Sequence, residues 1–333
     1  MRKRLLILFA SLAVFTLLLS ACGGDAGTDA GSDVRVAVVL DTGGENDRSF
    51  NEYTLKGARD AAEELGLDFA YVVSEASTDY ERNIDTFVSE GYNLIITVGF
   101  LMGDATAAAA EANPDVHFAI IDAFVDSPNV TNLLFAEDEA GYLAGTLAGC
   151  MTETNVIGTV SGMEIPPVVK FVTGFQTGAA NVNPDVTALN VYIPDFNDPA
   201  QGKQAGQAQI AEGADIIFGV GGNTGNGGLL AAFEEGLIAI GVDVDQYFTY
   251  PEISSALITS AQKNMDVAAG DAVRAFAAGE LAGGVQLATV ANSGVGLSPY
   301  HDWEDKIPQD CKDLVDAAYE GLAAGEVDTG YSE

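Results

Sequence analysis

The sequence has 333 residues, with 49 Asp and Glu against 14 Lys and Arg, and a formal net charge of −35. Such an acidic surface repels phosphate backbones and anionic lipid headgroups, which argues against nucleic acid as a partner and against membrane attachment by charge alone. The length is sufficient for two domains of ordinary size.

The N-terminus has the pattern of a secretory signal peptide. Three basic residues follow Met1, and Leu5–Leu19 is almost entirely apolar. This apolar run is shorter than the roughly 20 residues that a helix needs to span a bilayer. We therefore expect residues 1–21 to be a cleaved signal peptide rather than a permanent anchor.

The end of this segment carries a further motif. Leu19-Ser20-Ala21-Cys22 resembles the lipobox of bacterial lipoproteins, in which the cysteine is lipidated and becomes the first residue of the mature chain. The alternative is an ordinary secretory peptide that contains a cysteine. Residues 22–33 are small, polar and acidic and predict a flexible tether. We expect lipidation at Cys22 and a protein anchored on the extracytoplasmic face of the cell membrane.

Two further cysteines remain, Cys150 and Cys311. An oxidising compartment permits a disulfide between them, although the sequence does not give their geometry. Two buried free thiols are the alternative.

The chain after the tether alternates apolar runs with helical segments of 10–15 residues. This rhythm predicts a parallel sheet covered by helices on both faces. The expected strands are Val34–Leu40, Leu67–Val73, Asn93–Val98, His117–Asp122, Val156–Val160, Ala188–Ile193, Asp215–Val220, Leu237–Val242 and Val285–Ala291. The expected helices are Phe50–Leu65, Pro166–Asn181, Ala200–Gly213, Asn223–Gly236, Ala261–Gly279 and Asp310–Ala324.

Two consecutive sets of these units predict an α/β fold of two doubly wound parallel-sheet lobes, similar to type I periplasmic binding proteins. We expect a switch between lobes near residues 123–138 and further crossings later in the chain. The predicted N-terminal lobe is 34–125 plus about 261–295, and the predicted C-terminal lobe is 126–260 plus about 296–333. Ligands of such folds bind at the carboxyl ends of the strands, in the cleft between the lobes.

The first strand leads into Asp41-Thr42-Gly43-Gly44-Glu45-Asn46-Asp47-Arg48-Ser49-Phe50-Asn51. A glycine-containing loop that opens a helix presents backbone N–H groups and polar side chains at the cleft. Asp47 or Ser49 can cap that helix. For an arbitrary loop of this kind, Phe50 would be a core residue and Asp41 a turn residue.

The loop, however, resembles the opening motif of the basic membrane protein family of lipoproteins, which includes purine-nucleoside receptors of ABC importers. Other segments resemble the same family in the same order along nearly the whole mature chain. They are Gly141–Gly145, Ile157–Gly158, Gly162–Pro166, Gly174–Phe175, Asp195–Pro199, Gly202–Lys203, Gly222–Gly225, Ile240–Gln246 and Ser260–Lys263.

The resemblance implies a site in which two aromatic rings enclose a base while carboxylates and a lysine hold the ribose. Phe50 and Phe218 correspond to the stacking pair, with Phe196 as the alternative second ring. Asp243 and Lys263 correspond to the ribose clamp. The remaining ligand-binding positions are Asp41, Asn51, Asp122 and Gly222. The family further implies delivery of the ligand to an ABC permease and ATPase complex. We expect a monomer, because the clamp must dock on a permease, and we expect no cofactor or metal.

Other functions have weaker support in the sequence. The glycine-rich run Gly219–Gly228 follows a predicted strand, but its loose glycine spacing argues against a dinucleotide site, and it lacks a P-loop ending. The two histidines, His117 and His301, have no companions that indicate a metal or a nucleophile–base pair. The alternatives are the same clamp binding a sugar or another small polar solute, an extracytoplasmic nucleoside-acting enzyme, and an anchored sensory or adhesive protein.

Overall fold

The computed structural model describes residues 34–332, and the stretch Val34–Glu333 forms one compact unit. The predictions of a signal peptide, of lipidation at Cys22 and of a tether concern residues outside this part. Within the described residues, no helix combines the length and apolar character needed to cross a bilayer.

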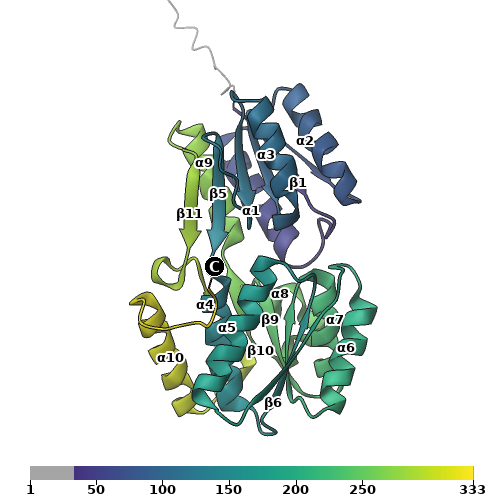
Figure 1. Ribbon diagram of the computed structural model, residues 1–333, viewed down its shortest axis with the longest axis vertical. Coiled ribbons are helices and arrows are strands. Elements are labelled where there is room, and N and C mark those ends of the chain that lie inside the picture. The colour runs from purple at the N-terminus through teal and green to yellow at the C-terminus, as the bar shows by residue number, and fades with distance from the viewer. Residues whose placement is uncertain (1–33, 333) are drawn as a thin grey trace, which may run out of the picture. The chain divides into compact units, whose positions relative to one another are not determined.

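Two six-stranded sheets organise the unit into two lobes (Figure 1). The first sheet has the order β11(Gly284–Ala288)-β5(Val130–Phe135)-β4(His117–Ile121)-β3(Leu94–Val98)-β1(Arg35–Leu40)-β2(Asp68–Val73). The second has the order β12(Val295–Leu297)-β10(Leu257–Lys263)-β9(Ile238–Asp243)-β8(Ile216–Val220)-β6(Val156–Ser161)-β7(Thr187–Tyr192). All neighbouring strands run parallel except β10 and β12, which are antiparallel.

Helices cover both faces of each sheet, as the unbroken apolar strands require. For example, Val36–Leu40 of β1 is fully buried. Helices α1(Phe50–Leu65), α2(Tyr80–Ser89), α3(Gly103–Ala112) and α9(Met265–Ala277) belong to the first lobe. Helices α4(Glu137–Met151), α5(Pro166–Val182), α6(Pro199–Ala211), α7(Gly222–Glu234), α8(Gln246–Thr249) and α10(Gln309–Ala323) belong to the second. Short 3-10 turns occupy Ser77–Asp79, Phe100–Met102, Pro251–Ala256, Val290–Asn292 and His301–Trp303.

The predicted two-lobed α/β fold is confirmed, and the chain passes between the lobes three times. The crossings follow β5, follow β10, and lie between β11 and β12. The first crossing falls inside the expected switch region 123–138, but β5 pairs with β4 in the first sheet. The boundary predicted at residues 125 and 126 is therefore wrong, because it assigns β5 to the second lobe.

The predicted helix Ala261–Gly279 also needs correction. Its first three residues end strand β10, and α9 begins at Met265. Leu257–Lys263 is a strand of the sheet interior and is buried except for Gln262. The sequence at the end of this strand nevertheless resembles the start of a helix. The second crossing therefore comes directly after Lys263.

Close helix packing explains one of the glycine motifs. Helices α4 and α5 pack side by side in the second lobe. A Cβ atom on Gly145 of α4 would lie 2.0 Å from the backbone oxygen of Phe175 in α5. A larger residue would force these helices apart.

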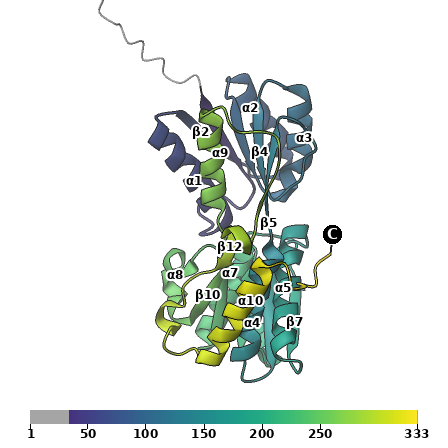
Figure 2. The same cartoon turned by 90° about the vertical axis from the view of Figure 1, so that its left-hand side faces the viewer.

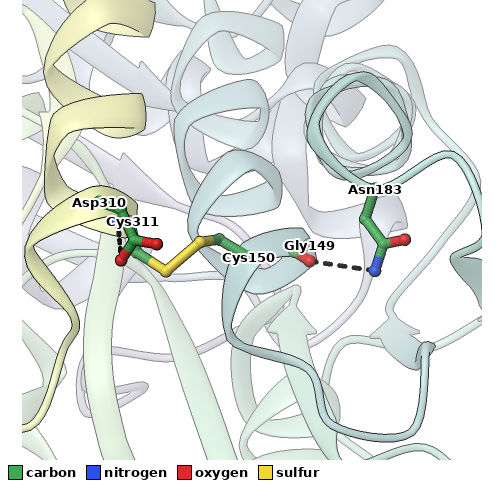
Figure 3. The surroundings of a disulfide bond; sticks show 5 residues. All are labelled: Gly149, Cys150, Asn183, Asp310 and Cys311. Atoms are coloured by element: carbon green, nitrogen blue, oxygen red, sulfur yellow. Dashed lines mark hydrogen bonds between the residues drawn. A yellow bond between two sulfur atoms is a disulfide. The ribbon is translucent and has the colours of Figure 1, made fainter.

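A disulfide joins Cys150 near the end of α4 to Cys311 in the first turn of α10 (Figure 3). The two Cα atoms are 5.7 Å apart. Figure 2 shows α10 alongside α4, so the bond fixes the C-terminal helix to the helix that follows the first crossing. Of the two alternatives left open by the sequence, a disulfide or two buried free thiols, the structure has the disulfide.

Candidate functional site

A cavity lies between the two lobes, where the carboxyl ends of their strands meet. About 620 Å³ of space within it is free of protein atoms, including the solvent at its open mouth. The first lobe lines it with Asp41, Gly43, Asp47, Phe50, Asn51, Gly99, Phe100, Leu101 and Asp122. The second lobe contributes Ile165, Pro167, Val168, Phe171, Phe196, Val220, Gly221, Gly222, Val242 and Asp243, and Lys263 lies at the second crossing.

The loop between β1 and α1 supplies the polar wall of the first lobe. Asp47 caps α1, because its carboxylate accepts hydrogen bonds from the backbone N–H groups of Ser49, Asn51 and Glu52 at 2.8–3.1 Å. The Asn51 side-chain amide donates to both Asp47 (3.1 Å) and Asp41 (2.8 Å). These two bonds fix the orientation of the amide, since the flipped form would turn its oxygen toward two carboxylates. The Asn51 oxygen is buried and has no protein partner in the described chain.

Burial dominates the electrostatics of this wall. It raises the pKa of Asp41, against the hydrogen bonds from Gly43 and Asn51 that lower it. It also raises the pKa of Asp47 to about 7. The wall presents mainly acceptor oxygens, so it suits a ligand that donates N–H or O–H groups.

Four aromatic side chains line the cavity, Phe50 and Phe100 from the first lobe and Phe171 and Phe196 from the second. Phe50 is in the first turn of α1, and Phe196 is in the loop between β7 and α6. The Phe196 ring packs against Gly162, where a Cβ atom would lie 2.4 Å from the ring. The glycine after β6 therefore makes room for this ring.

The prediction that Phe218 forms the stacking pair with Phe50 is wrong. Phe218 is in the middle of β8 and is fully buried. Its ring contacts Phe175 (centroids 5.0 Å apart) and Phe171 (6.1 Å), so its side chain packs in the core rather than lining the cavity. The alternative, Phe196, lines the cavity instead.

A buried charge cluster lies at the crossings. The Lys263 ammonium donates to both oxygens of Asp122 at 2.7 and 2.6 Å and to Glu137 Oε1 at 3.1 Å. All three side chains are 5% exposed or less. Asp122 follows β4, Lys263 ends β10, and Glu137 begins α4, so the cluster joins two of the three crossings.

Burial alone would lower the pKa of Lys263, but the charges of Asp122, Glu137 and Asp243 together raise it above its ordinary value. Burial raises the pKa of Asp122, although Lys263 opposes this shift. Burial likewise raises the pKa of Glu137 to about 7, again with Lys263 in opposition. The lysine therefore stays charged, and it brings a fixed positive charge to the cavity wall.

Asp243 faces this cluster from the second lobe. Its Oδ2 accepts a hydrogen bond from the Ser49 hydroxyl of the first lobe at 2.6 Å. Asp243 and Asp122 both adopt left-handed backbone conformations, with φ of 67° and 68°. They come at the ends of β9 and β4, which occupy the same place in their two sheets. Such strained positions at strand ends are typical of binding sites and aim both carboxylates at the cleft.

The geometry can thus hold a small uncharged ligand between aromatic walls while carboxylates accept its hydroxyl or N–H groups. Within residues 34–332 no cluster of His, Cys, Asp and Glu could hold a metal ion. Gly221 and Gly222 of the glycine-rich run line the cavity at the start of α7, where the backbone can approach a ligand closely.

A family model named Bmp, described as ABC transporter substrate-binding protein PnrA-like, matches residues 34–318. The chain belongs to the Bmp family. Its relatives include the ABC transporter nucleoside-binding protein BmpA of Lactococcus lactis, which is 30% identical over 98% of this chain and 99% of that protein. An uncharacterized lipoprotein of Pyrococcus horikoshii is 30% identical over 89% of this chain and 77% of that protein.

Among solved structures, an ABC transporter solute-binding protein of Aeropyrum pernix is similar in fold. Its TM-score is 0.82 and its sequence identity 28%, and the match covers 89% of this chain and 92% of that one. This member of the Bmp family is therefore a substrate-binding protein of an ABC transporter, with the two-lobed fold of type I periplasmic binding proteins.

Seven of the eight residues predicted to bind ligand line the cavity of this Bmp protein, namely Asp41, Phe50, Asn51, Asp122, Gly222, Asp243 and Lys263. Asp47, which lines the cavity, and Glu137, which accepts a hydrogen bond from Lys263, are not among the predicted ligand residues. The acidic run Glu137-Asp138-Glu139 at the start of a helix could have indicated that Glu137 belongs to the site. The apolar wall from Ile165 to Phe171 was not predicted either, because the sequence of these residues is that of an ordinary helix start.

Proposed function

We propose that this protein captures a purine nucleoside between its lobes and delivers it to the permease and ATPase of an ABC importer. The observation that carries the proposal is a single cavity lined by aromatic rings from both lobes, among them Phe50 and Phe196, together with carboxylates and a lysine. A flat purine offers a face to each ring, and stacking is worth about 1–3 kcal/mol per base. The name of the Lactococcus lactis relative as a nucleoside-binding protein supports the same ligand class.

The polar groups suit the sugar. Vicinal ribose hydroxyls can both donate to one carboxylate, and hydrogen bonds to charged groups contribute about 1.5–3 kcal/mol each. Asp243 and Asp122 are the carboxylates that flank Lys263 at the cavity. The acidic lining disfavours a phosphorylated ligand, so we propose a nucleoside rather than a nucleotide.

The proposed mechanism is a hinge-bending clamp. Ligand enters between separated lobes, and contacts from both lobes stabilise the closed form that the permease recognises. The loop from Thr42 to Ser49 already contacts the second lobe at several points, among them a hydrogen bond from Thr249 to the Arg48 carbonyl at 2.8 Å. We further propose that lipid on Cys22 holds the clamp at the extracytoplasmic face of the membrane, in keeping with a lipoprotein among its relatives.

Calorimetric titration tests the ligand. A soluble chain beginning at Gly31 would be unfolded and refolded to remove co-purified ligand, then titrated with adenosine, guanosine, inosine, uridine and ribose. We expect dissociation constants in the micromolar range or below for the purine nucleosides and no binding of ribose. The absence of binding for every nucleoside would refute the proposal. Release of free base from inosine would instead show that the protein is catalytic.

A further inference from the structure

The C-terminal tail, residues 325–332, follows α10 and lies outside the segment that the family model matches, which ends at residue 318. It contacts the second lobe through specific groups. The Thr329 side chain is buried, and its hydroxyl donates to Asp138 Oδ2 at 2.5 Å. The Tyr331 ring lies with its centre 5.7 Å from the Lys170 ammonium.

Both residues that the tail contacts, Asp138 and Lys170, lie next to Glu137 of the buried charge cluster at the crossings. Asp138 is the neighbour of Glu137 in the first turn of α4. The Lys170 ammonium lies 3.4 Å from Glu137 Oε2 and donates to the carbonyl of Phe135, the last residue of β5, at 3.3 Å. Lys170 therefore contacts the residues on both sides of the first crossing.

Glu137 connects Lys170 to the cavity wall, because it contacts both Lys170 and Lys263. Its Oε1 accepts from Lys263, whereas its Oε2 is buried without a hydrogen-bond partner among the described residues. The nearby charge of Lys170 is what compensates this buried oxygen, and an uncompensated buried charge is strongly destabilising. A shift of Lys170 would therefore destabilise the Glu137 carboxylate, and a shift of Glu137 would move the Lys263 ammonium at the cavity wall.

We propose that residues 325–332 are a strap that fixes Lys170 and Asp138 and thereby holds Glu137 and Lys263 in the arrangement of the closed lobes. The inference rests on the proposed clamp function. Hinge motions concentrate at the few residues where the chain crosses between lobes. A strap attached to the first turn of α4 restricts motion at the first of these crossings. Thr329 and Tyr331 are thus positioning residues that act through others and do not touch the ligand.

The test uses the soluble chain beginning at Gly31, because Val34–Glu333 is one compact unit. The variants are Thr329→Val, which removes the hydroxyl at nearly constant shape, Thr329→Ser, which keeps it, and a chain that ends at Ala324. Ser332→Ala is the matched control, since Ser332 is an exposed residue of the same tail. Purine-nucleoside affinity is measured by calorimetry.

Lobe separation is measured independently by spin labels on cysteines introduced as D60C and E212C, at exposed positions of the first and second lobes. The disulfide occupies the native cysteines of this chain, so only the new ones react. We expect T329V and the shortened chain to bind about ten-fold more weakly, the size of one hydrogen bond to a charged group. We also expect their label distances to shift toward longer values, while T329S and S332A behave like the wild type.

Equal affinity and equal label distances in T329V and the wild type would overturn the strap. Equal losses in T329V and T329S would also overturn it, because packing rather than the hydroxyl would then be responsible. If the shortened chain does not fold, the two Thr329 variants decide alone. The label distances without ligand separate this result from the ligand proposal: a shift in T329V supports the strap even if no nucleoside binds.

Discussion

Arg48 of the first lobe forms a bidentate ion pair with Glu252 of the second, with nitrogen–oxygen distances of 2.8 and 3.1 Å. The guanidinium also lies 4.5 Å from the centre of the Tyr250 ring. Arg48 has a left-handed backbone, with φ of 63°, which turns its carbonyl toward the Thr249 hydroxyl. One residue of the β1–α1 loop thus makes three separate contacts across the cleft. The loop that leads directly into Phe50 and Asn51 of α1 is therefore also the loop that joins the closed lobes.

The contacts of Arg48 with Thr249, Tyr250 and Glu252, which we call the latch, predict an effect on the rate of ligand dissociation. Arg48→Ala should speed ligand dissociation by a few-fold with a smaller effect on association, because it weakens the closed state without changing the cavity lining. The pair is partly exposed, so added salt should reduce the difference between the variant and the wild type. Stopped-flow competition measures the dissociation rate, and Lys56→Ala, which removes an exposed cation of the same lobe, is the control. Identical dissociation rates at low salt would contradict the latch.

Two of the four cavity rings, Phe50 and Phe196, give a second prediction. Phe50→Ala and Phe196→Ala should each weaken purine-nucleoside binding by about ten-fold or more, the loss expected for one stacking partner. Phe218→Leu should leave affinity nearly unchanged and lower the unfolding temperature instead, because Phe218 packs against Phe171 and Phe175 in the core. Calorimetry and thermal unfolding of the same samples separate the two effects. Weak binding in F218L with unchanged stability would restore Phe218 as a ligand contact.

We expect the Asp243 carboxylate to accept hydrogen bonds from the ribose hydroxyls. In Asp243→Asn we expect the affinity advantage of inosine over 2′,3′-dideoxyinosine to fall by about ten-fold or more, because a neutral amide accepts ribose hydroxyl bonds less strongly than a carboxylate. Ser49→Ala removes the hydroxyl that holds Asp243 at 2.6 Å and should cause a smaller change in the same direction. Calorimetric titration of both ligands measures the advantage in each variant. An undiminished inosine advantage in D243N would exclude Asp243 from ribose recognition.

The contrast between Phe218 and Phe196 shows what the sequence could and could not predict. Strand positions and loop glycines follow from local patterns, whereas the ligand residues were implied by the family resemblance, and seven of those eight line one cavity. Which ring faces the cleft depends on the side of the sheet from which it projects, and an unbroken buried strand such as β8 gives no alternation to reveal that. Similarly, β10 ends in Ala-Gln-Lys, which has no strand propensity, and becomes a strand through its neighbours β9 and β12.

The disulfide should stabilise the fold without affecting the ligand. Replacing Cys150 and Cys311 together by alanine removes a bond that closes a long loop, and we expect a loss of about 2–4 kcal/mol in the free energy of unfolding. Neither cysteine lines the cavity, so nucleoside affinity should stay within about two-fold of the wild type, the usual range for substitutions away from the site. Denaturant unfolding and calorimetry measure the two quantities. A large loss of affinity at unchanged stability would place the bond in the hinge rather than in the scaffold.

Buried carboxyls predict how stability depends on pH. Burial raises the pKa of Asp41, Asp122 and Asp243, and raises the pKa of Asp47 and Glu137 to about 7. In the unfolded chain these groups ionise near pH 4. Between about pH 4 and pH 7 the folded protein therefore holds protons that the unfolded chain has released, so the free energy of unfolding should decrease as the pH rises through this window.

Thermal unfolding between about pH 4.5 and pH 8 tests this expectation, at high salt to screen the repulsion of the many surface acids. Asp47→Asn replaces one titrating group by an amide, so the fall in unfolding temperature near pH 7 should become shallower in that variant. Asp104→Asn removes an exposed carboxylate in the same lobe and serves as the control, because it should leave the slope unchanged. A stability that rises toward pH 8, or an equal slope in D47N and the wild type, would show that the Asp47 carboxyl stays ionised in the folded protein. Its hydrogen bonds from three backbone N–H groups would then outweigh the cost of its burial.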